Sequence, residues 1–234
     1  MSQRDTAFTV AMLLACGVAY AIAADVEQAA KGVAERTNAF RKAQGLEPVQ
    51  PNAELRAAAR EFARFMAESG KYSHTADGRR PAQRAAAQGY EACIVSENIA
   101  YLYRSQGYDA PTLAREMVEG WKQSPEHREA MVDPAVSQVG VGIAQSASGR
   151  YYGVQMFGRP KSAAITFTVR NRSGERVAYR AGERRFSLPP RAERTHSVCR
   201  PMQLAMETPA PFSGRARDGA TYLVRGGGRV DVVP

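Results

Sequence analysis

The chain reads WKQSPEHR from Trp121 to Arg128, and this stretch joins two helical patterns. In the first, over residues 113–122, apolar residues recur at helical spacing up to the chain's only tryptophan. In the second, Ser124 stands directly before Pro125, the order typical of an N-cap and the first residue of a helix. We therefore expect a new helix to begin at this point.

The capping interpretation assigns roles to the neighbouring side chains. A serine at an N-cap accepts a hydrogen bond from a backbone N–H, here that of Glu126 or His127, and such a serine is a poor nucleophile. A carboxylate in the first turn complements the helix dipole, so we expect Glu126 to face solvent. From the residues alone, His127 is interpreted as a packed or surface histidine, and a chemical role is the alternative.

The first residues of the chain predict export. Residues 7–23 form an uncharged, alanine-rich apolar run after a short polar leader, and they end in Ala21-Ile22-Ala23. Small residues at this position fit the cleavage pattern of a secretory signal peptide, so residues 1–23 are predicted to be removed from a secreted or periplasmic protein. A retained N-terminal membrane anchor and a lipoprotein signal around Cys16 are the alternatives.

Export affects the interpretation of the cysteines. Of the three in the sequence, only Cys93 and Cys199 would remain after cleavage. An even pair in a compartment that permits disulfides makes a Cys93–Cys199 bridge one hypothesis, and two separate buried thiols are the other.

Residues 24–159 predict helices on either side of a small antiparallel sheet, an α+β arrangement. The apolar spacing gives two amphipathic helices over residues 25–70, with Gly45 ending the first and Asn52 capping the second. A short helix is expected over residues 81–88. The β-rich segments 139–143 and 151–157 flank the turn residues 146–149 and predict a hairpin.

Residues 160–234 have a different composition and predict a small basic β-sandwich-like domain. Short strands are expected over residues 165–169, 177–179, 186–188, 221–224 and 230–233. Residues 159–234 contain fifteen basic and six acidic residues, which accounts for the whole net charge of +9, and fourteen of the fifteen are arginines. Arginine suits phosphate, sulfate and carboxylate groups, so an anionic envelope or extracellular polymer is the expected partner. The alternative is a soluble, Arg-rich β surface.

A nucleic-acid role is not expected for this basic region. Single-stranded nucleic acid would need aromatic side chains presented among the charges. Phe167, Tyr179, Phe186 and Tyr222 instead follow the pattern of core residues, and export also argues against nucleic acid. His196, the third histidine, shows no evident partner in the sequence.

Six short motifs follow one another over residues 26–158. They are NAFR (38–41) with GLEP (45–48), YSH (72–74) with GRRP (78–81), SENIA (96–100), WKQSPEHR (121–128), VGVG (139–142) and QMFG (155–158). In this order they resemble the CAP superfamily of cysteine-rich secretory proteins, antigen 5 and pathogenesis-related 1 proteins, in its bacterial SCP-like branch.

The resemblance implies a CAP-type α-β-α sandwich for residues 26–158, and the strand pattern of residues 160–234 predicts that a small all-β domain follows it. It also implies a central cleft with two histidines and an acidic partner, which match His74, His127 and Glu97. Members outside the bacterial branch have a second glutamate where this chain has Ser124, so the four-residue site is incomplete. From the residues alone, Glu97 is equally interpreted as a buried carboxylate that accepts backbone N–H groups.

The chemistry of these residues leaves the function open between classes. Two imidazoles and a carboxylate suit zinc or another divalent metal, with His74 and His127 as the ligands. The favoured hypothesis is an exported binding or interaction module whose cleft contains His74, Glu97, Ser124 and His127, and enzymatic activity is not favoured. The alternative is a metal-assisted or serine-type hydrolase that uses the same residues. The family's range of roles adds apolar-ligand carriage, for which the sequence indicates no pocket.

Overall fold

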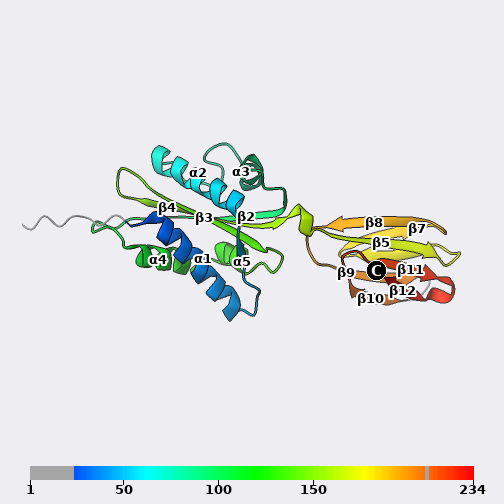
Figure 1. The fold of residues 1–234 in the computed structure, drawn as a ribbon. Coiled ribbons are helices and arrows are strands. Elements are labelled where there is room, and N and C mark those ends of the chain that lie inside the picture. The colour runs from blue at the N-terminus through cyan, green and yellow to red at the C-terminus, as the bar shows by residue number, and fades with distance from the viewer. Residues whose placement is uncertain (1–23, 209–210) are drawn as a thin grey trace, which may run out of the picture.

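The structure is a computed structural model that describes residues 24–208 and 211–234. The predicted signal peptide, residues 1–23, lies outside the described residues. Within the described ranges, no helix has both the length and the apolar character needed to cross a membrane. The chain forms two lobes, one with helices on a sheet and one made of strands (Figure 1).

The helical lobe, from α1 to β4, is a three-layer sandwich. Its four-stranded sheet has the order β1-β3-β4-β2, with β4 antiparallel to both neighbours and β1 parallel to β3. Helices α1, α4 and α5 cover one face and α2 and α3 the other (Figure 1), which confirms the predicted α-β-α architecture. The elements are α1 Val26–Ala43, β1 Gln50–Pro51, α2 Ala53–Ser69, α3 Pro81–Ala87, β2 Ala92–Leu102, α4 Ala110–Gln123, α5 Pro125–Val132, β3 Gln138–Gln145 and β4 Tyr151–Pro160.

Two separate apolar cores hold the layers together. One lies between the sheet and helices α1 and α4, and Trp121, Leu113 and Val33 are among its fully buried side chains. The other lies between the sheet and α2, around Phe62 and Met66. The apolar residues that recur at helical spacing in the sequence therefore point into these cores.

The capping residues of the helices follow the sequence signals closely. Asn52 caps α2 by accepting a hydrogen bond from the backbone N–H of Leu55 at 2.8 Å, as predicted. The first helix ends at Ala43, and Gly45 lies in the turn that follows it with a positive φ of 72°. Helix α4 begins at Ala110 rather than at residue 113, because Asp109 caps it by accepting the N–H of Thr112 at 2.7 Å.

The glycines of the VGVG motif set the distance between α2 and the sheet. A Cβ atom on Gly140 would collide with the backbone of Leu55 and Arg56, and one on Gly142 with the backbone of Ala59 and Arg60. Only glycine lets the helix backbone lie directly on strand β3 in this way. These two positions therefore allow α2 to pack directly against strand β3.

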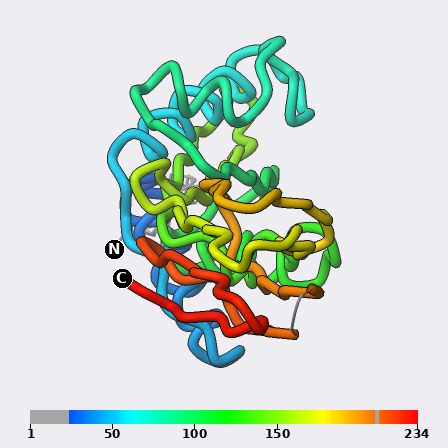
Figure 2. Tube along the Cα trace, turned by 90° about the vertical axis from the view of Figure 1, so that its right-hand side faces the viewer, coloured from blue at the N-terminus to red at the C-terminus, as the bar shows by residue number. Residues whose placement is uncertain are grey.

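The β lobe, from β5 to β12, consists of two four-stranded sheets. Their orders are β10-β9-β6-β7 and β12-β11-β5-β8, and side chains of both enclose one core that includes Phe167, Tyr179 and Tyr222. Figure 2 views this lobe in front of the helical lobe. The strands are β5 Ile165–Arg172, β6 Val177–Ala181, β7 Arg184–Leu188, β8 Glu193–Val198, β9 Gln203–Thr208, β10 Phe212–Arg215, β11 Thr221–Arg225 and β12 Val230–Val233.

The all-β prediction for this lobe is confirmed, but three of its strands were not predicted. Strands β8, β9 and β10 pair antiparallel with β5, β6 and β9 respectively. β8 is an edge strand whose residues are mostly exposed and polar, so its sequence lacks the apolar alternation typical of a half-buried strand.

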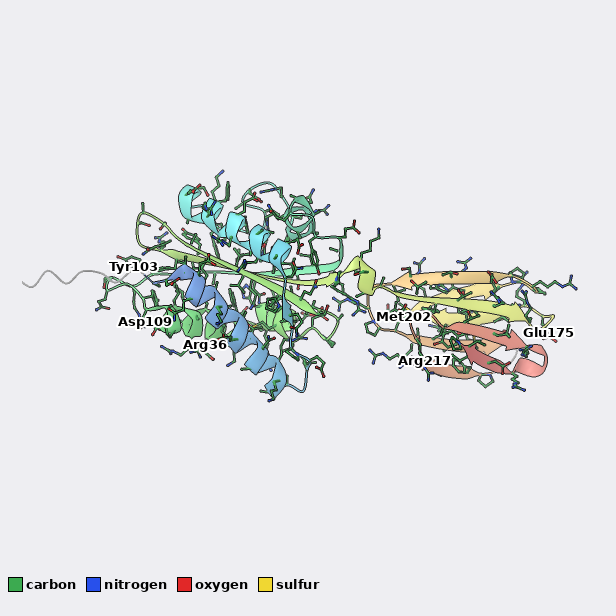
Figure 3. All side chains as sticks on the ribbon, in the orientation of Figure 1. Arg36, Tyr103, Asp109, Glu175, Met202 and Arg217 are labelled. Atoms are coloured by element: carbon green, nitrogen blue, oxygen red, sulfur yellow. A yellow bond between two sulfur atoms is a disulfide. The ribbon has the colours of Figure 1, made fainter. Side chains whose placement is uncertain are left out.

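Two side-chain links connect the lobes besides the chain itself. Cys93 at the start of β2 forms a disulfide with Cys199. Next to it, Arg200 donates two hydrogen bonds to the carboxylate of Asp133, at 2.9 and 2.8 Å. Met202 lies at the end of the β lobe nearest the helical lobe, and Glu175 lies at the far end (Figure 3).

Candidate binding site at the edge strand β2

Glu97 on strand β2 is the centre of a polar cluster. Its side chain is 1% exposed, and both carboxylate oxygens accept hydrogen bonds from Nη2 of Arg84, at 2.8 and 2.7 Å. The imidazole Nδ1 of His74 lies 2.9 Å from Oε1. The hypothesis that Glu97 accepts backbone N–H groups is therefore wrong, because its donors are side chains. We call Arg84, His74, Glu97 and His127 the histidine cluster.

Arg84 on helix α3 is the residue of this cluster that the sequence reasoning missed. Its side chain is 1% exposed, and the guanidinium lies over the ring of Phe62 with Cζ 3.6 Å from the ring centroid. It also donates to Asp77 at 2.8 Å and to the carbonyl of His74 at 2.9 Å. The only sequence signal was an arginine in an alanine-rich helix, which more often marks an exposed position.

Asp77 is the second carboxylate of this network. Burial alone would raise its pKa, but the backbone N–H of Arg79 and the charge of Arg84 outweigh burial and hold the pKa below its usual range. Arg84 therefore joins two carboxylates, one on the loop before α3 and one on β2. This buried network fixes the loop that carries His74.

The two histidines differ in their surroundings. His74 is half exposed at 49% and contacts Glu97 through Nδ1, which directs Nε2 away from the carboxylate. His127 on α5 is partly buried, and its carbonyl accepts a hydrogen bond from Nδ2 of Asn98 at 3.1 Å. Burial lowers the pKa of His127, the charge of nearby His74 lowers it further, and Glu126 opposes both. The structure thus brings His74 and Glu97 into contact, with His127 close enough for its charge to be coupled to that of His74.

Ser124 has the position of an N-cap but does not act as predicted. Its backbone is extended, and its carbonyl accepts the first hydrogen bond of α5, from the N–H of Arg128 at 2.8 Å. The predicted bond from a backbone N–H to the Ser124 hydroxyl is not formed, so that prediction is wrong. Among the hydrogen bonds of the described residues, none joins this hydroxyl to His127 or to Glu97. Glu126 is exposed, as expected.

A cavity of about 510 Å³ lies beside the cluster and is lined by both lobes. Ser96 and Glu97 of β2 line it together with Glu126 and Glu129 of α5. The Asp133–Arg200 ion pair completes the lining, so the β lobe contributes one side chain to this cavity.

The donor groups of the cluster do not make a three-ligand metal site. Residues 24–208 and 211–234 contain no group of three His, Cys, Asp or Glu side chains that could hold a metal ion. Glu97, the natural third ligand beside the two histidines, has both oxygens bonded to the guanidinium of Arg84. A cation at this carboxylate would have to displace another positive charge, so Glu97 does not fit as a third ligand beside the two histidines.

Comparison with known proteins identifies the family. Residues 34–157 match the cysteine-rich secretory protein family, CAP. The protein "Uncharacterized protein YkwD" of Bacillus subtilis is 31% identical over 119 residues. This match covers 50% of the chain and 43% of YkwD, so the chain spans less than half the length of that relative.

Three solved structures are similar in fold. An outer surface protein of Borrelia burgdorferi has a TM-score of 0.51 and 22% identity, over 61% of this chain and 100% of that one. An extracellular SCP-domain protein of Bacillus anthracis has a TM-score of 0.48 and 19% identity, over 57% and 41%. NaASP2, a distant relative solved with Zn²⁺, has a TM-score of 0.43 and 17% identity, over 56% and 80%.

These comparisons agree with the motifs and with the three-layer architecture. The matched residues run from within α1 to within β4 and include Glu97 and both histidines of the cluster. The chain therefore belongs to the CAP family of cysteine-rich secretory proteins.

Proposed function

We propose that this chain acts outside the cytoplasm as a binding module, with the histidine cluster as its ligand site. Support for the location comes from the secretory pattern of residues 1–23 and from relatives described as outer surface and extracellular proteins. Support for binding comes from the half-exposed imidazole of His74, which is held by a buried carboxylate and can offer Nε2 to a polar ligand.

The engagement of Glu97 by Arg84 is the observation that carries this proposal. A hydrolytic triad needs a carboxylate that orients an imidazole and an imidazole that contacts a nucleophile. Glu97 and His74 have the first of these contacts, but Arg84 neutralises the carboxylate. In the described part of the chain, the His74 ring has no hydrogen bond to a serine or threonine hydroxyl. This arrangement favours ligand binding over catalysis.

Metal content and turnover test this function. We expect the purified chain and the His74→Ala plus His127→Ala variant to bind the same, substoichiometric amount of zinc, measured by mass spectrometry of the metal after dialysis. Because the cluster favours binding over catalysis, we also expect no turnover of peptide or ester substrates.

The third histidine provides a matched control for the removal of two imidazoles. The His196→Gln variant changes a histidine of the β lobe, away from the cluster. The proposed site has no resident metal. Zinc that binds stoichiometrically to the purified chain, is lost from the double variant and is kept by His196→Gln would contradict this. Turnover that disappears in His127→Ala would establish the hydrolase instead.

We also propose that the β lobe holds the protein at an anionic polymer or envelope surface. Five of its arginines form salt bridges with Glu193, Glu207 or Asp231. Seven others are exposed and take part in none of the salt bridges among the described residues: Arg172, Arg176, Arg184, Arg191, Arg194, Arg215 and Arg217. Exposed guanidinium groups without an internal carboxylate are available for external anions.

Salt dependence tests this attraction. Retention of the full chain on heparin, used as the anionic polymer, is expected to fall steeply between about 0.05 and 0.5 M NaCl, since screening shortens the reach of exposed charges. Arg184→Glu plus Arg194→Glu should elute at lower salt. Arg36→Glu plus Arg64→Glu, at two exposed positions of the helical lobe, is a charge-matched control that leaves elution nearly unchanged. Retention that does not depend on salt, or that both variants weaken equally, would refute this proposal.

A further inference from the structure

The edge of the sheet opposite the histidine cluster is open. Strand β3 pairs with β4 along its whole length, but its other side meets only the two residues of β1. On that side, the carbonyls of Ser137 and Val139 accept the N–H groups of Gln50 and Asn52, both at 2.9 Å. Beyond Asn52 the chain turns into helix α2, so no strand continues along β3.

The register determines which backbone groups face this open edge. Neighbouring residues of a strand turn their N–H and C=O groups to opposite sides, so Val141 faces the same way as Val139. Gly140 and Gly142 face β4 instead. Strand β1 pairs only with Gln138 and Val139, and none of the turn, loop or cap hydrogen bonds of residues 24–208 and 211–234 involves Val141. Val141 therefore presents one backbone donor and one acceptor outward, although it is only 5% exposed.

These backbone groups lie in a groove of about 670 Å³ between α1 and α2. Its floor is Val139, Gly140 and Val141 of β3. Small residues of α1, Ala30 and Ala34, line one wall, and the first turn of α2 lines the other. The groove is thus largely apolar, and an extended chain that followed β3 along its floor would advance about 3.3 Å per residue.

The rim of the groove carries an excess of positive charge. Lys31 of α1 and Arg56 of α2 line it. Lys31 lies 3.9 Å from Glu35 in a highly exposed pair, and exposed pairs of this kind are weak. Arg56 forms none of the salt bridges of the described residues. Glu27, the acidic residue of the lining, is paired with Arg60 at 3.1 Å. An occupant with carboxylates beside its backbone would complement this rim.

We propose that this groove binds a short, extended, acidic peptide segment of a partner protein, which adds a strand to the open edge of β3. The backbone groups of the peptide pair with the N–H and C=O of Val141. The acidic side chains of the peptide contact Lys31 and Arg56. Strand addition of this kind takes its affinity from main-chain hydrogen bonds and its specificity from the groove walls. The site is separate from the histidine cluster, since the two lie at opposite edges of the sheet.

Backbone amide exchange of the full, isotope-labelled chain tests this proposal. In the free protein, the amide of Val141 should exchange at least tenfold faster than the amide of Gly142, because only the second faces β4. The probe is a blocked pentapeptide of alternating aspartate and valine. Its addition should slow exchange at Val141 and shift the amide signals of residues 139–141.

Matched probes and variants separate strand addition from other binding. The same peptide with methylated backbone nitrogens loses its donors and should not bind. Lys31→Glu plus Arg56→Glu should weaken binding of the unmethylated peptide by roughly tenfold, a change of about 1.4 kcal/mol. Arg64→Glu, an exposed position of α2 away from the groove, should leave binding unchanged.

Three results would overturn the proposal. Protection of Val141 equal to that of Gly142 in the free chain would mean that the edge already has a partner. Equal binding of the methylated peptide would show that the groove takes apolar ligands without pairing. Absence of binding at about 1 mM peptide would exclude a functional strand site, because the binding free energy would then be weaker than about −4 kcal/mol.

Discussion

Replacing Arg84 with alanine is expected to lower the free energy of unfolding of the helical lobe by about 3–5 kcal/mol, the cost of breaking a buried ion pair. The substitution leaves Glu97, whose side chain is 1% exposed, as an uncompensated carboxylate beside β4. It also removes the hydrogen bonds to Asp77 and to the carbonyl of His74. Urea unfolding of the full chain, followed by tryptophan fluorescence of Trp121, measures this loss in the lobe concerned.

A double variant distinguishes the buried charge from lost packing. Arg84→Met plus Glu97→Gln removes both charges and keeps similar volumes. Its loss of unfolding free energy should therefore be smaller than the summed losses of the two single variants, by a coupling of about 0.5–3 kcal/mol. Arg79→Ala is the control, because Arg79 pairs with Asp77 and Glu61 at 38% exposure and should cost less than about 1 kcal/mol. A cost for Arg84→Ala as small as that of the control would contradict the buried network.

Loss of the Cys93–Cys199 disulfide is expected to cost about 2–5 kcal/mol, the usual effect of removing a native bridge from a secreted domain. The cysteines are 106 residues apart in sequence, and a bridge that closes so long a loop strongly restricts the unfolded chain. The measurement is urea unfolding with and without a reducing agent. The stability of Cys93→Ser plus Cys199→Ser should equal that of the reduced protein.

The thiols themselves provide the check on this prediction. Alkylation without reduction should leave Cys93 and Cys199 unmodified, and alkylation after reduction should modify both, as read from the intact mass. The double serine variant is the control, because a reducing agent should leave its unfolding curve unchanged. Alkylation of either thiol before reduction would show that the bridge is not formed in solution.

Local signals predicted the helices well because their causes are local. Asn52 caps α2, Pro125 begins α5, and the apolar residues of both lobes face the cores that their spacing indicated. Strand β2 was not predicted as a strand, although it carries Glu97. It lies at the edge of the sheet with partial exposure at most positions, so it shows neither a fully apolar run nor a clear alternation.

The site was predicted in part. The predictions failed where the side chains that contact each other are distant in sequence. The family motifs indicated His74, His127 and Glu97, and the structure places the first and third in contact. Nothing near Glu97 in the sequence indicated Arg84, because the pairing depends on how α3 folds over β2. His196 seemed to lack a partner, yet its Nε2 lies 2.8 Å from the hydroxyl of Tyr179 on the facing sheet. Such pairings require tertiary structure.

The disulfide at the junction also determines how the protein carries mechanical load. The β lobe has two covalent connections to the helical lobe, one through Pro160 at the end of β4 and one through Cys93 in β2. These strands are antiparallel neighbours, and Ala92 is opposite Pro160 in their register. A pull on an anchored β lobe is therefore shared by two adjacent strands at one end of the sheet.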